Sequence, residues 1–297
     1  MKFQTLSLVA GTQYCNARCP FCVSHMTGLK HINQRPETIH GRNLDKALRL
    51  AEIGDVTTVI ITGKGEPMLF PEHIDNYLEA CSRFNFPFIE LQTNGSMLDS
   101  AFSKKSREEI VLRLKEWYKM GLTTILISNV GYDIELNHRN YFPKHKSWIN
   151  IKEVISIVKE AGINIRLTTV GIKGGIDSPE KLQTLMEWAS ELQVDQITWR
   201  PVNKPAVSEE NHGIAKWVNE NYISYESVND INHEVTSRGT LIYKLVHGAA
   251  VYDYMGKNLC LSNCLTIDPV EETVRQLIFS PNGSLFTDWQ FKGSKLL

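Results

Sequence analysis

TTVIIT at residues 57–62 is followed by PEHIDNYLEACSRF at residues 71–84 and by PFIELQ at residues 87–92. Short runs of apolar and β-branched residues on both sides of a longer amphipathic segment are typical of a strand–helix–strand unit. The short runs are almost continuously apolar, which is typical of strands covered on both faces of a parallel sheet.

The same alternation extends to about residue 200. It predicts strands at Thr5–Ala10, Thr57–Thr62, Pro87–Gln92, Thr123–Ser128, Asn164–Thr169 and Gln196–Trp199. It predicts helices at Leu44–Glu52, Pro71–Phe84, Ser106–Lys119, Ile151–Ala161 and Pro179–Leu192. Parallel strands joined by right-handed helical crossovers give an α/β architecture. Because the repeats stop short of eight, we expect a partial (β/α)6 barrel.

The pattern changes after Pro201, so we expect a core at residues 1–200 and a C-terminal α+β extension, or lid, at residues 201–297. The extension is predicted to hold a helix at Val207–Tyr222 and short strands at Leu241–Val246 and Val251–Tyr254. Its end has two alternating runs, Arg275–Phe279 and Ser284–Trp289, joined by Ser-Pro-Asn-Gly. Asn-Gly between such runs predicts a β-hairpin.

The composition is that of an ordinary globular protein, with 297 residues, a formal net charge of −1, 42% hydrophobic and 22% charged residues. These values exclude a disordered or collagen-like chain. No stretch reaches the roughly 18 apolar residues that a membrane span needs. The start, MKFQTLSLVAGTQYC, is typical of a strand and not of a secretory signal. We therefore expect a cytoplasmic protein without membrane attachment.

The near-neutral charge also argues against a general nucleic-acid-binding surface. The basic and aromatic segment Asn137–Lys146 is predicted to be an exposed, solvated loop.

Three of the six cysteines, Cys15, Cys19 and Cys22, lie within eight residues of one another. Three thiolates at this spacing can converge from one loop onto an iron–sulfur cluster, which usually has four cysteine ligands. With three ligands, one iron stays open, and an open metal position usually binds a substrate or cofactor. The alternative is a structural zinc site with a distant fourth ligand such as His25.

Polar residues follow the predicted strands at the edge where α/β proteins place their sites. The segments are Thr62-Gly-Lys-Gly-Glu-Pro67, Gln92-Thr-Asn-Gly95, Ile127-Ser-Asn129 and Val170-Gly-Ile-Lys-Gly-Gly-Ile-Asp177. The glycines at 63 and 65 let the backbone approach a ligand closely, and Glu66 is a candidate partner for an ammonium group.

With these features together, the sequence resembles the radical S-adenosylmethionine (radical SAM) superfamily over roughly residues 5–200. Cys15, Cys19, Phe21 and Cys22 fit its CxxxCxΦC motif, in which Φ is aromatic. The resemblance implies that the three cysteines bind a [4Fe-4S] cluster. It also implies that the open iron binds the amino and carboxylate groups of SAM.

The resemblance extends to the other segments that contact SAM in the family. Gly63, Gly65, Glu66 and Pro67 resemble the GGEP motif, with Lys64 where a second consecutive glycine often falls. The further implied cofactor contacts are Phe21 and Asn94, the ribose-side residues Ser128 and Asn129, and the adenine-side residues Ile172 and Gly174. The last two match GxIxGxxE loosely, because Val170 replaces its first glycine and Asp177 its glutamate.

The family chemistry is reductive cleavage of SAM to methionine and a 5′-deoxyadenosyl radical, which abstracts hydrogen from a substrate. The resemblance thus implies a reducing partner such as flavodoxin or ferredoxin. No catalytic side chain is assigned by the sequence.

The candidate substrate-binding residues are His25, Trp199, Arg200, Asp288 and Trp289. An acid beside aromatic plates suits a flat heterocycle with adjacent N–H donors, and an arginine can hold a carboxylate or phosphate. Packing and turn roles are the alternative for the C-terminal pair. In size and layout the chain is similar to radical enzymes that act on small free molecules. We therefore expect a small-molecule substrate, with a 7-deazaguanine base such as queuine, released by a lyase, as the specific hypothesis.

Other functions remain open from the sequence. A peptide-modifying radical enzyme would hold extra iron, for which Cys260 and Cys264 are candidate ligands, although a local structural feature of the lid is the plainer interpretation. An RNA-modifying radical enzyme would bind RNA through Arg139, Lys144 and Lys146. A zinc-stabilised binding module is the alternative outside enzymes. Cys81 lies on a predicted helix.

Overall fold

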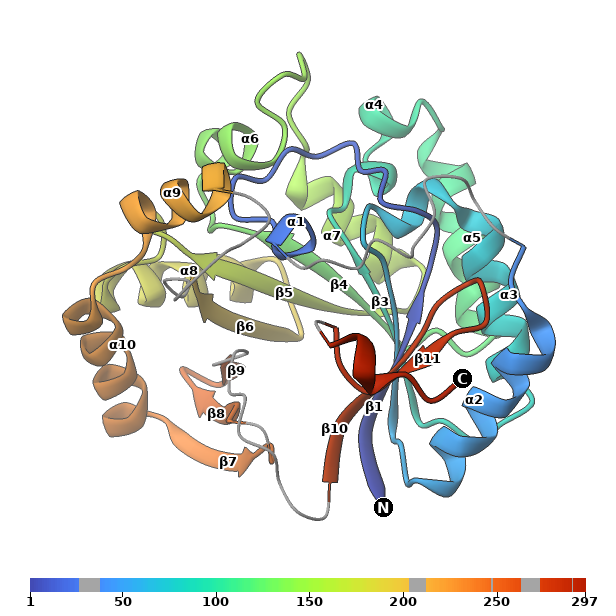
Figure 1. Cartoon of the computed structure of the whole chain (residues 1–297). Helices are drawn as coiled ribbons and strands as arrows, with labels where there is room; N and C mark the ends of the chain where they lie inside the picture. The colour runs from blue at the N-terminus through green and yellow to red at the C-terminus, as the bar shows by residue number, and fades with distance from the viewer. Residues whose placement is uncertain (27–37, 203–211, 247, 263–272, 290) are drawn as a thin grey trace.

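In the residues that the computed structural model of the chain describes, eleven strands form one sheet (Figure 1). Its strand order is β11-β10-β1-β2-β3-β4-β5-β6-β9-β8-β7. The structure describes residues 1–26, 38–202, 212–246, 248–262, 273–289 and 291–297.

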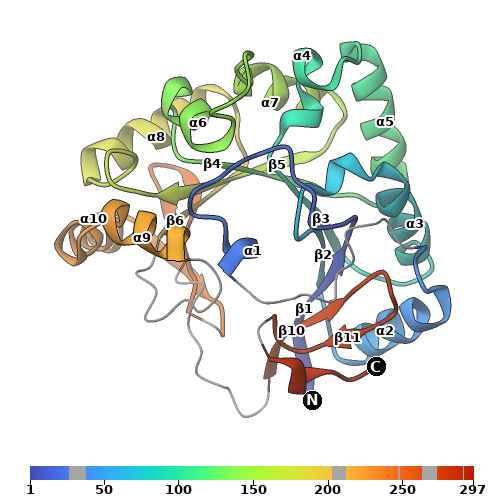
Figure 2. The same cartoon turned by 45° about the horizontal axis from the view of Figure 1, so that its top comes forward.

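The centre of the sheet consists of six strands that pair in parallel and in sequence order. They are β1 (Lys2–Val9), β2 (Thr58–Thr62), β3 (Phe88–Thr93), β4 (Thr124–Asn129), β5 (Asn164–Gly171) and β6 (Gln196–Pro201). Figure 2 shows them as an arc with helices along its outer side. These helices are α2 (Gly41–Ile53), α3 (Pro71–Cys81), α5 (Arg107–Lys119), α7 (Ile151–Glu160) and α8 (Pro179–Glu191). The prediction of a partial α/β barrel is confirmed.

Several helices begin where the sequence carries a start signal. Ser106 and Glu109 form a capping box at the start of α5. Pro71 and Pro179 occupy the first turns of α3 and α8. Proline is favourable there because the N–H that it lacks would have no partner within the helix. These local signals explain why the predicted helix starts agree with the structure.

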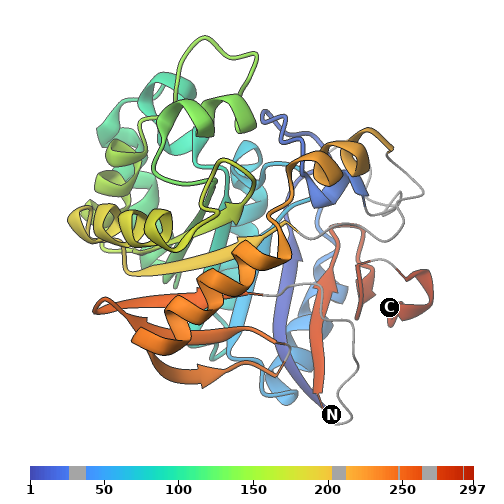
Figure 3. The same cartoon turned by 90° about the vertical axis from the view of Figure 1, so that its left-hand side faces the viewer.

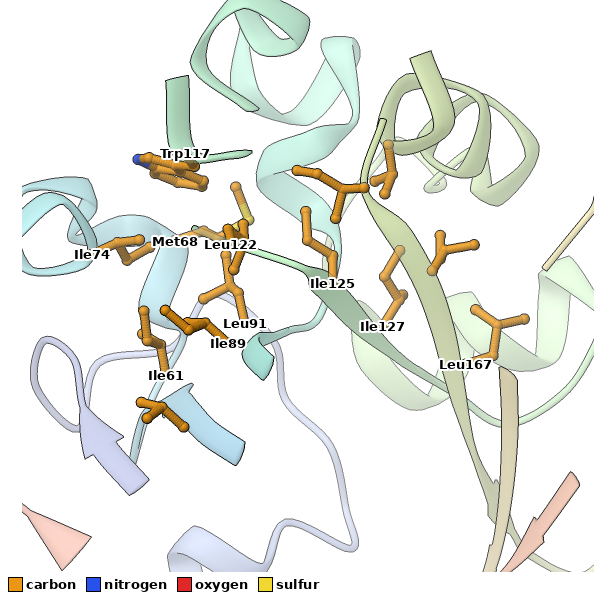
Figure 4. Packing of buried hydrophobic residues seen from close by; sticks show 14 of the residues in the cluster. Ile61, Met68, Ile74, Ile89, Leu91, Trp117, Leu122, Ile125, Ile127 and Leu167 are labelled. Carbon is orange, nitrogen blue, oxygen red and sulfur yellow. The ribbon is translucent and has the colours of Figure 1, made fainter. Parts of the chain in front are cut away.

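The hydrophobic core lies between the strands and these helices. Figure 4 shows alternate strand residues such as Ile89 and Leu91 packed with Ile74 of α3 and Trp117 of α5. The intervening residues, such as Glu90, point to the opposite face, which we call the inner face of the barrel. The nearly continuous apolar runs are typical of strands covered on both faces, but in the described residues the helices cover the outer face and the inner face carries polar side chains.

The C-terminal extension lengthens the sheet at both ends. Beyond β6 it contributes α9 (His212–Asn221), α10 (Tyr225–Arg238), β7 (Thr240–Lys244), β8 (Ala250–Tyr254) and β9 (Lys257–Leu261). β9 pairs in parallel with β6, and β8 and β7 continue the sheet antiparallel. Figure 3 shows α10 lying along these added strands.

At the other end, β10 (Thr273–Phe279) pairs in parallel with β1, and β11 (Leu285–Phe286) returns antiparallel beside it. The predicted hairpin around Asn282-Gly283 is thus present, with a shorter second strand. The role of the extension as a lid stays a prediction. Its described strands continue the sheet at both ends. They satisfy backbone groups that the edges of a six-stranded sheet would leave unpaired.

Short elements complete the chain: α1 (Val23–Met26), η1 (Pro67–Leu69), η2 (Ser96–Leu98), α4 (Ser100–Ser103), α6 (Ile134–Tyr141) and η3 (Lys292–Ser294). The predicted loop Asn137–Lys146 is wrong in its first half, which belongs to α6. The Asp133 side chain accepts hydrogen bonds from the first turn of α6, and the helix buries Leu136 and Tyr141. Among the described residues, no helix has the length and apolarity needed to span a bilayer.

Candidate functional site

The loop that carries the three clustered cysteines follows β1 and crosses the carboxyl ends of the strands (Figure 2). Two side chains of α3 fix its start. The Tyr77 hydroxyl donates to the Val9 carbonyl oxygen at 2.8 Å, and His73 Nδ1 accepts from the Gly11 N–H at 3.1 Å. Farther along, the Arg18 N–H donates to the Tyr141 carbonyl oxygen at 2.7 Å. The loop is therefore held from two sides.

Cys15, Cys19 and Cys22 are each half-buried. Burial, with contributions from the charges of Glu66 and Cys22, raises the pKa of the Cys15 thiol to about 11. Burial and the neighbouring Cys22 and Cys15 also raise the pKa of Cys19. Without a cation the neutral thiol is therefore the favoured form here, and a bound cluster would supply the positive charge that stabilises the thiolates.

A single metal ion is a different case from a cluster. Within the residues that the structure describes, no group of three His, Cys, Asp or Glu side chains is arranged to hold one metal ion. In a [4Fe-4S] cluster each cysteine binds a different iron, so its three thiolates need not converge on one point.

The turn after β2 lies directly against the cysteine loop. The Glu66 N–H donates to the Tyr14 carbonyl oxygen at 3.1 Å. A Cβ atom at Gly65 would overlap with that same carbonyl group, so only glycine permits this approach. The turn and the cysteine loop therefore form one structural unit, with Pro67 starting η1 behind it.

Glu66 is buried, with 2% of its surface exposed. Its carboxylate accepts hydrogen bonds from the Met68 N–H at 3.0 Å, the Thr93 hydroxyl at 2.6 Å and the Asn94 N–H at 2.8 Å. Burial raises its pKa, and these three hydrogen bonds oppose the rise. The carboxylate that the sequence assigns to an ammonium group is thus used within the chain, where it fixes the turn to the end of β3.

A small polar network joins the end of β3 to the cysteine loop. Asn94 Nδ2 donates to Asn16 Oδ1 at 2.8 Å and lies 3.9 Å from Cys15 Sγ. Ser96 Oγ accepts from Asn16 Nδ2 at 2.8 Å and donates to Asn94 Oδ1 at 2.6 Å. Asn94 is therefore held beside the candidate cluster ligand.

A pocket of about 40 Å³ lies between the end of β4 and α6, and Ser128 and Asn129 both line it. Its lining residues also include His138 and Tyr141. The buried atoms Asn129 Nδ2, His138 Nδ1 and Tyr141 Oη have no hydrogen-bond partner among the described residues. Buried polar atoms are normally paired, so this pocket fits a polar group such as a ribose hydroxyl or an ordered water.

Tyr141 is a site residue that the sequence analysis missed. Its ring packs edge-on against Phe21, with centroids 5.7 Å apart. Burial, followed by the charges of Cys19 and Cys22, raises its pKa well above 10. Helical spacing places Tyr141 on α6, but only the tertiary fold brings it to the cysteines.

The adenine-side residues also lie near the cysteine loop. Ile172 is buried in one apolar cluster with Phe21 and Tyr141. Gly174 has a φ of +81°, which favours glycine, and its N–H donates to Asp177 Oδ2 at 2.6 Å. Asp177, which replaces the glutamate of the family motif, therefore holds the loop in shape and pairs with Lys181 at 2.6 Å.

The C-terminal acid and aromatic lie close to the turn after β2. The Trp289 ring centroid is 6.0 Å from Lys64 Nζ, and its indole N–H donates to Gln276 Oε1 at 3.1 Å. Asp288 Oδ1 accepts from the Phe291 N–H at 3.2 Å, so one of its oxygens serves a turn. The fold thus brings a segment at the end of the chain to the candidate SAM site.

The remaining candidate substrate residues do not gather in the same way. Trp199 is only 1% exposed, belongs to the core on the helix-covered side, and donates its indole N–H to the Ile176 carbonyl oxygen at 3.0 Å. The pleat of β6 turns Trp199 away from the inner face, and its role in substrate binding stays a prediction. Arg200, the next residue, lies on the inner face, and its charge acts on Tyr141. His25 is exposed in α1.

The other cysteines are placed separately. Cys81 is buried at the end of α3, and Cys260 is buried in β9. Cys264 lies outside the described residues.

Solved structures with similar folds include proteins bound to S-adenosylmethionine and a radical SAM methyltransferase. SuiB of Streptococcus suis, bound to S-adenosylmethionine, aligns with a TM-score of 0.61 and 18% identity over 99% of this chain and 63% of its own. The protein anSMEcpe with bound AdoMet and a Kp18Cys peptide aligns with a TM-score of 0.55 and 11% identity over 98% and 76%. A radical SAM methyltransferase from Sphaerobacter thermophilus gives 0.52 and 18% over 78% and 63%.

This chain thus spans less than two thirds of the length of SuiB. At such identities the similarity shows the fold alone. A search of curated proteins found no match. The sequence model of the Radical SAM superfamily matches residues 9–189. Because this match covers more than half of the chain, the protein belongs to the radical SAM superfamily, whose cofactors are a [4Fe-4S] cluster and S-adenosylmethionine.

Proposed function

We propose that Cys15, Cys19 and Cys22 hold the [4Fe-4S] cluster and that the enzyme acts on a small molecule, a 7-deazaguanine base such as queuine, in a lyase reaction. The observation that carries the cofactor assignment is the junction of the cysteine loop with the glycine turn. This junction places the three thiols beside the segment that resembles the family's methionine-binding motif.

When bound, the cluster and SAM supply a 5′-deoxyadenosyl radical that abstracts hydrogen from the substrate. The residues of the chain bind SAM and orient it. The backbone of Gly63 and Gly65 receives the methionine end, and Glu66 holds that backbone in shape. Ser128 and Asn129 receive the ribose, with Ile172 and Gly174 on the adenine side.

Structural observations support the assignments at Asn129 and Ile172. The unpartnered amide nitrogen of Asn129 favours a ligand at the end of β4. The clustered packing of Phe21 with Ile172 excludes water from one side of the cysteine loop. A water-poor site protects a reactive intermediate from side reactions.

The substrate proposal draws on the C-terminal segment. Trp289 lies near Lys64 of the glycine turn, which supports a role for this aromatic ring beside the SAM site. A flat base could stack on the indole, and the Asp288 carboxylate is the proposed acceptor for ring N–H groups of that base. His25 and Arg200 are the other proposed substrate contacts.

The proposal includes an electron donor such as flavodoxin or ferredoxin and a cytoplasmic location. A reducing compartment keeps cysteine thiols available for iron, which supports this location.

The test is anaerobic reconstitution with iron and sulfide, followed by incubation with SAM, dithionite and queuine. We expect formation of 5′-deoxyadenosine and loss of queuine. Trp289→Ala should reduce queuine turnover at least tenfold, whereas Tyr118→Ala, which removes an exposed aromatic ring on the outer helix α5, should not. Intact queuine alongside turnover of another substrate would overturn the substrate proposal. Zinc without iron or sulfide would overturn the cofactor assignment.

A further inference from the structure

A chain of polar side chains crosses the inner face of the barrel at mid-height. The Thr62 hydroxyl donates to Gln92 Oε1 at 3.2 Å, and Gln92 Nε2 donates to Glu90 Oε1 at 2.9 Å. On the other side, Arg166 Nη1 donates to Glu90 Oε2 at 2.8 Å and Arg166 Nε donates to the Thr198 hydroxyl at 3.1 Å. The chain therefore links β2, β3, β5 and β6.

Glu90 and Arg166 form an ion pair at this place, where a fold would usually have apolar side chains. Glu90 is only 4% exposed, and its strand neighbours Ile89 and Leu91 belong to the apolar core. Burying a carboxylate is costly, and a buried ion pair rarely stabilises a fold more than apolar side chains would. This cost indicates that the inner face holds Arg166 in place for a reason other than packing.

One nitrogen of the Arg166 guanidinium, Nη2, is available to donate a hydrogen bond to a ligand. Its Nε and Nη1 are used by Thr198 and Glu90, whereas Nη2 has no hydrogen-bond partner in the described part of the chain. The Arg166 side chain is 31% exposed, in contrast to 5% for Glu90. A planar guanidinium fixed by two of its nitrogens presents the third in a defined direction.

Arg166 also lies at a suitable depth. It precedes Thr168 by two residues on β5, and Thr168 pairs with Ser128. At about 3.3 Å per residue, the Arg166 row lies about 7 Å below the row that contains the proposed ribose contact. A small molecule whose reacting carbon lies beside the SAM site would therefore have its far end within reach of Arg166.

We propose that Arg166 is a specificity-determining residue whose Nη2 donates a hydrogen bond to a neutral carbonyl oxygen of the substrate. This inference rests on the proposed function and adds the group that the inner face recognises. The acceptor is neutral because Glu90 already balances the charge of Arg166, and a substrate carboxylate would lie near the Glu90 carboxylate. In a 7-deazaguanine base the acceptor is the lactam oxygen.

A donor–acceptor exchange in the ligand tests this contact. The two probes are 7-deazaguanine and 7-deaza-2,6-diaminopurine, which replaces the lactam oxygen with an amino group that donates. Their equilibrium binding is measured on the anaerobic holoenzyme with SAM present. The wild-type enzyme should prefer 7-deazaguanine by about tenfold or more. The amino group of the other probe donates, so it cannot accept a hydrogen bond from Arg166 Nη2, and two donors would face each other.

Arg166→Met should reduce this preference by about threefold or more. The part that remains reports the ring N1–H, which 7-deaza-2,6-diaminopurine lacks and from which Asp288 is proposed to accept a hydrogen bond. Arg166→Lys keeps a positive charge beside Glu90 but has no second terminal nitrogen to donate to the substrate, so it should reduce the preference as well. It provides a second variant if Arg166→Met does not fold. Arg107→Met is the matched control, because Arg107 makes the same type of contacts with Glu160 and Ser156 on the outer surface. The control should keep the full preference.

The outcomes separate the two proposals. Equal binding of both probes by the wild type, or an unchanged preference in a folded Arg166→Met protein, overturns the role of Arg166 and leaves the proposed function standing. Failure of the wild type to bind either probe, while it still cleaves SAM, overturns the 7-deazaguanine substrate and this inference with it.

Discussion

Glu66 Oε2 accepts a hydrogen bond of 2.8 Å from the backbone N–H of Asn94, which joins the turn after β2 to the end of β3. Both residues belong to segments that the sequence assigns to cofactor binding. The structure shows that Glu66 serves this site through the backbone that it fixes.

Glu66→Ala should therefore impair both the fold and SAM binding. The change leaves the Met68 N–H, the Thr93 hydroxyl and the Asn94 N–H without their acceptor in a buried place. We expect the free energy of unfolding of the apoprotein to fall by about 3 kcal/mol. Urea denaturation measures this change. Glu187→Ala, at an exposed position of α8, is the control and should stay within about 0.5 kcal/mol of the wild type. An equally small effect at Glu66 would contradict the structural role.

Gly65→Ala should disrupt the cysteine loop, because its Cβ would overlap with the Tyr14 carbonyl group. We expect reconstituted protein to lose most of its iron and its affinity for SAM. Iron analysis and equilibrium dialysis with SAM measure the two effects. Gly41→Ala is the matched control, since a Cβ there meets no atom within 4 Å. Normal iron content in the Gly65 variant would show that the loop tolerates displacement.

Alanine at Cys15, Cys19 or Cys22 should abolish the cluster absorption and SAM cleavage, because each thiolate is assigned one iron. Ultraviolet–visible spectra and 5′-deoxyadenosine formation after anaerobic reconstitution measure both losses. Cys260→Ala and Cys264→Ala should leave the iron content unchanged, as should Cys81→Ala in the core. A lower iron content in either of the first two controls would indicate a second cluster and refute the single-cluster assignment.

The contact between Tyr254 and Glu234 should give a pH-dependent contribution to stability. The Tyr254 hydroxyl donates to Glu234 Oε1 at 2.6 Å, and this hydrogen bond lowers the pKa of Glu234. A lowered pKa in the folded state stabilises the protein above the unfolded value of 4.5, and this stability is lost as the pH falls through the folded pKa.

Tyr254→Phe should thus reduce the free energy of unfolding by about 1 kcal/mol at pH 7, and the difference from the wild type should shrink below pH 4.5. Denaturation at several pH values checks this dependence. Tyr252→Phe on the same strand is the control, because its hydroxyl has no partner among the described residues. A difference that stays constant down to pH 3 would contradict the linkage.

The local sequence was sufficient to predict the central strands and helices. The strand predicted at 57–62 is found at Thr58–Thr62, and the helix predicted from Pro71 begins there. Such elements depend on apolar periodicity and on start signals within a few residues, which the sequence displays directly. The cysteine motif and the glycine turn were recognisable for the same reason, since each lies within one short segment.

Contacts between distant segments were not recognisable. Trp199 and Arg200 are neighbours in sequence, but the pleat of β6 directs them to opposite faces, and only the helices packed outside decide which face is the core. Likewise, nothing local joins Glu90 to Arg166, which are 76 positions apart and meet across the inner face.

The sequence alone determined the repeated strand–helix units and the three-cysteine loop, because both are encoded by neighbouring residues. The tertiary structure decided that β10 lies beside β1, that Trp289 lies near Lys64, and that Glu66 turns into the chain. These arrangements depend on which backbone edges and buried polar groups find partners once the whole chain has folded, and no short stretch of sequence contains both partners.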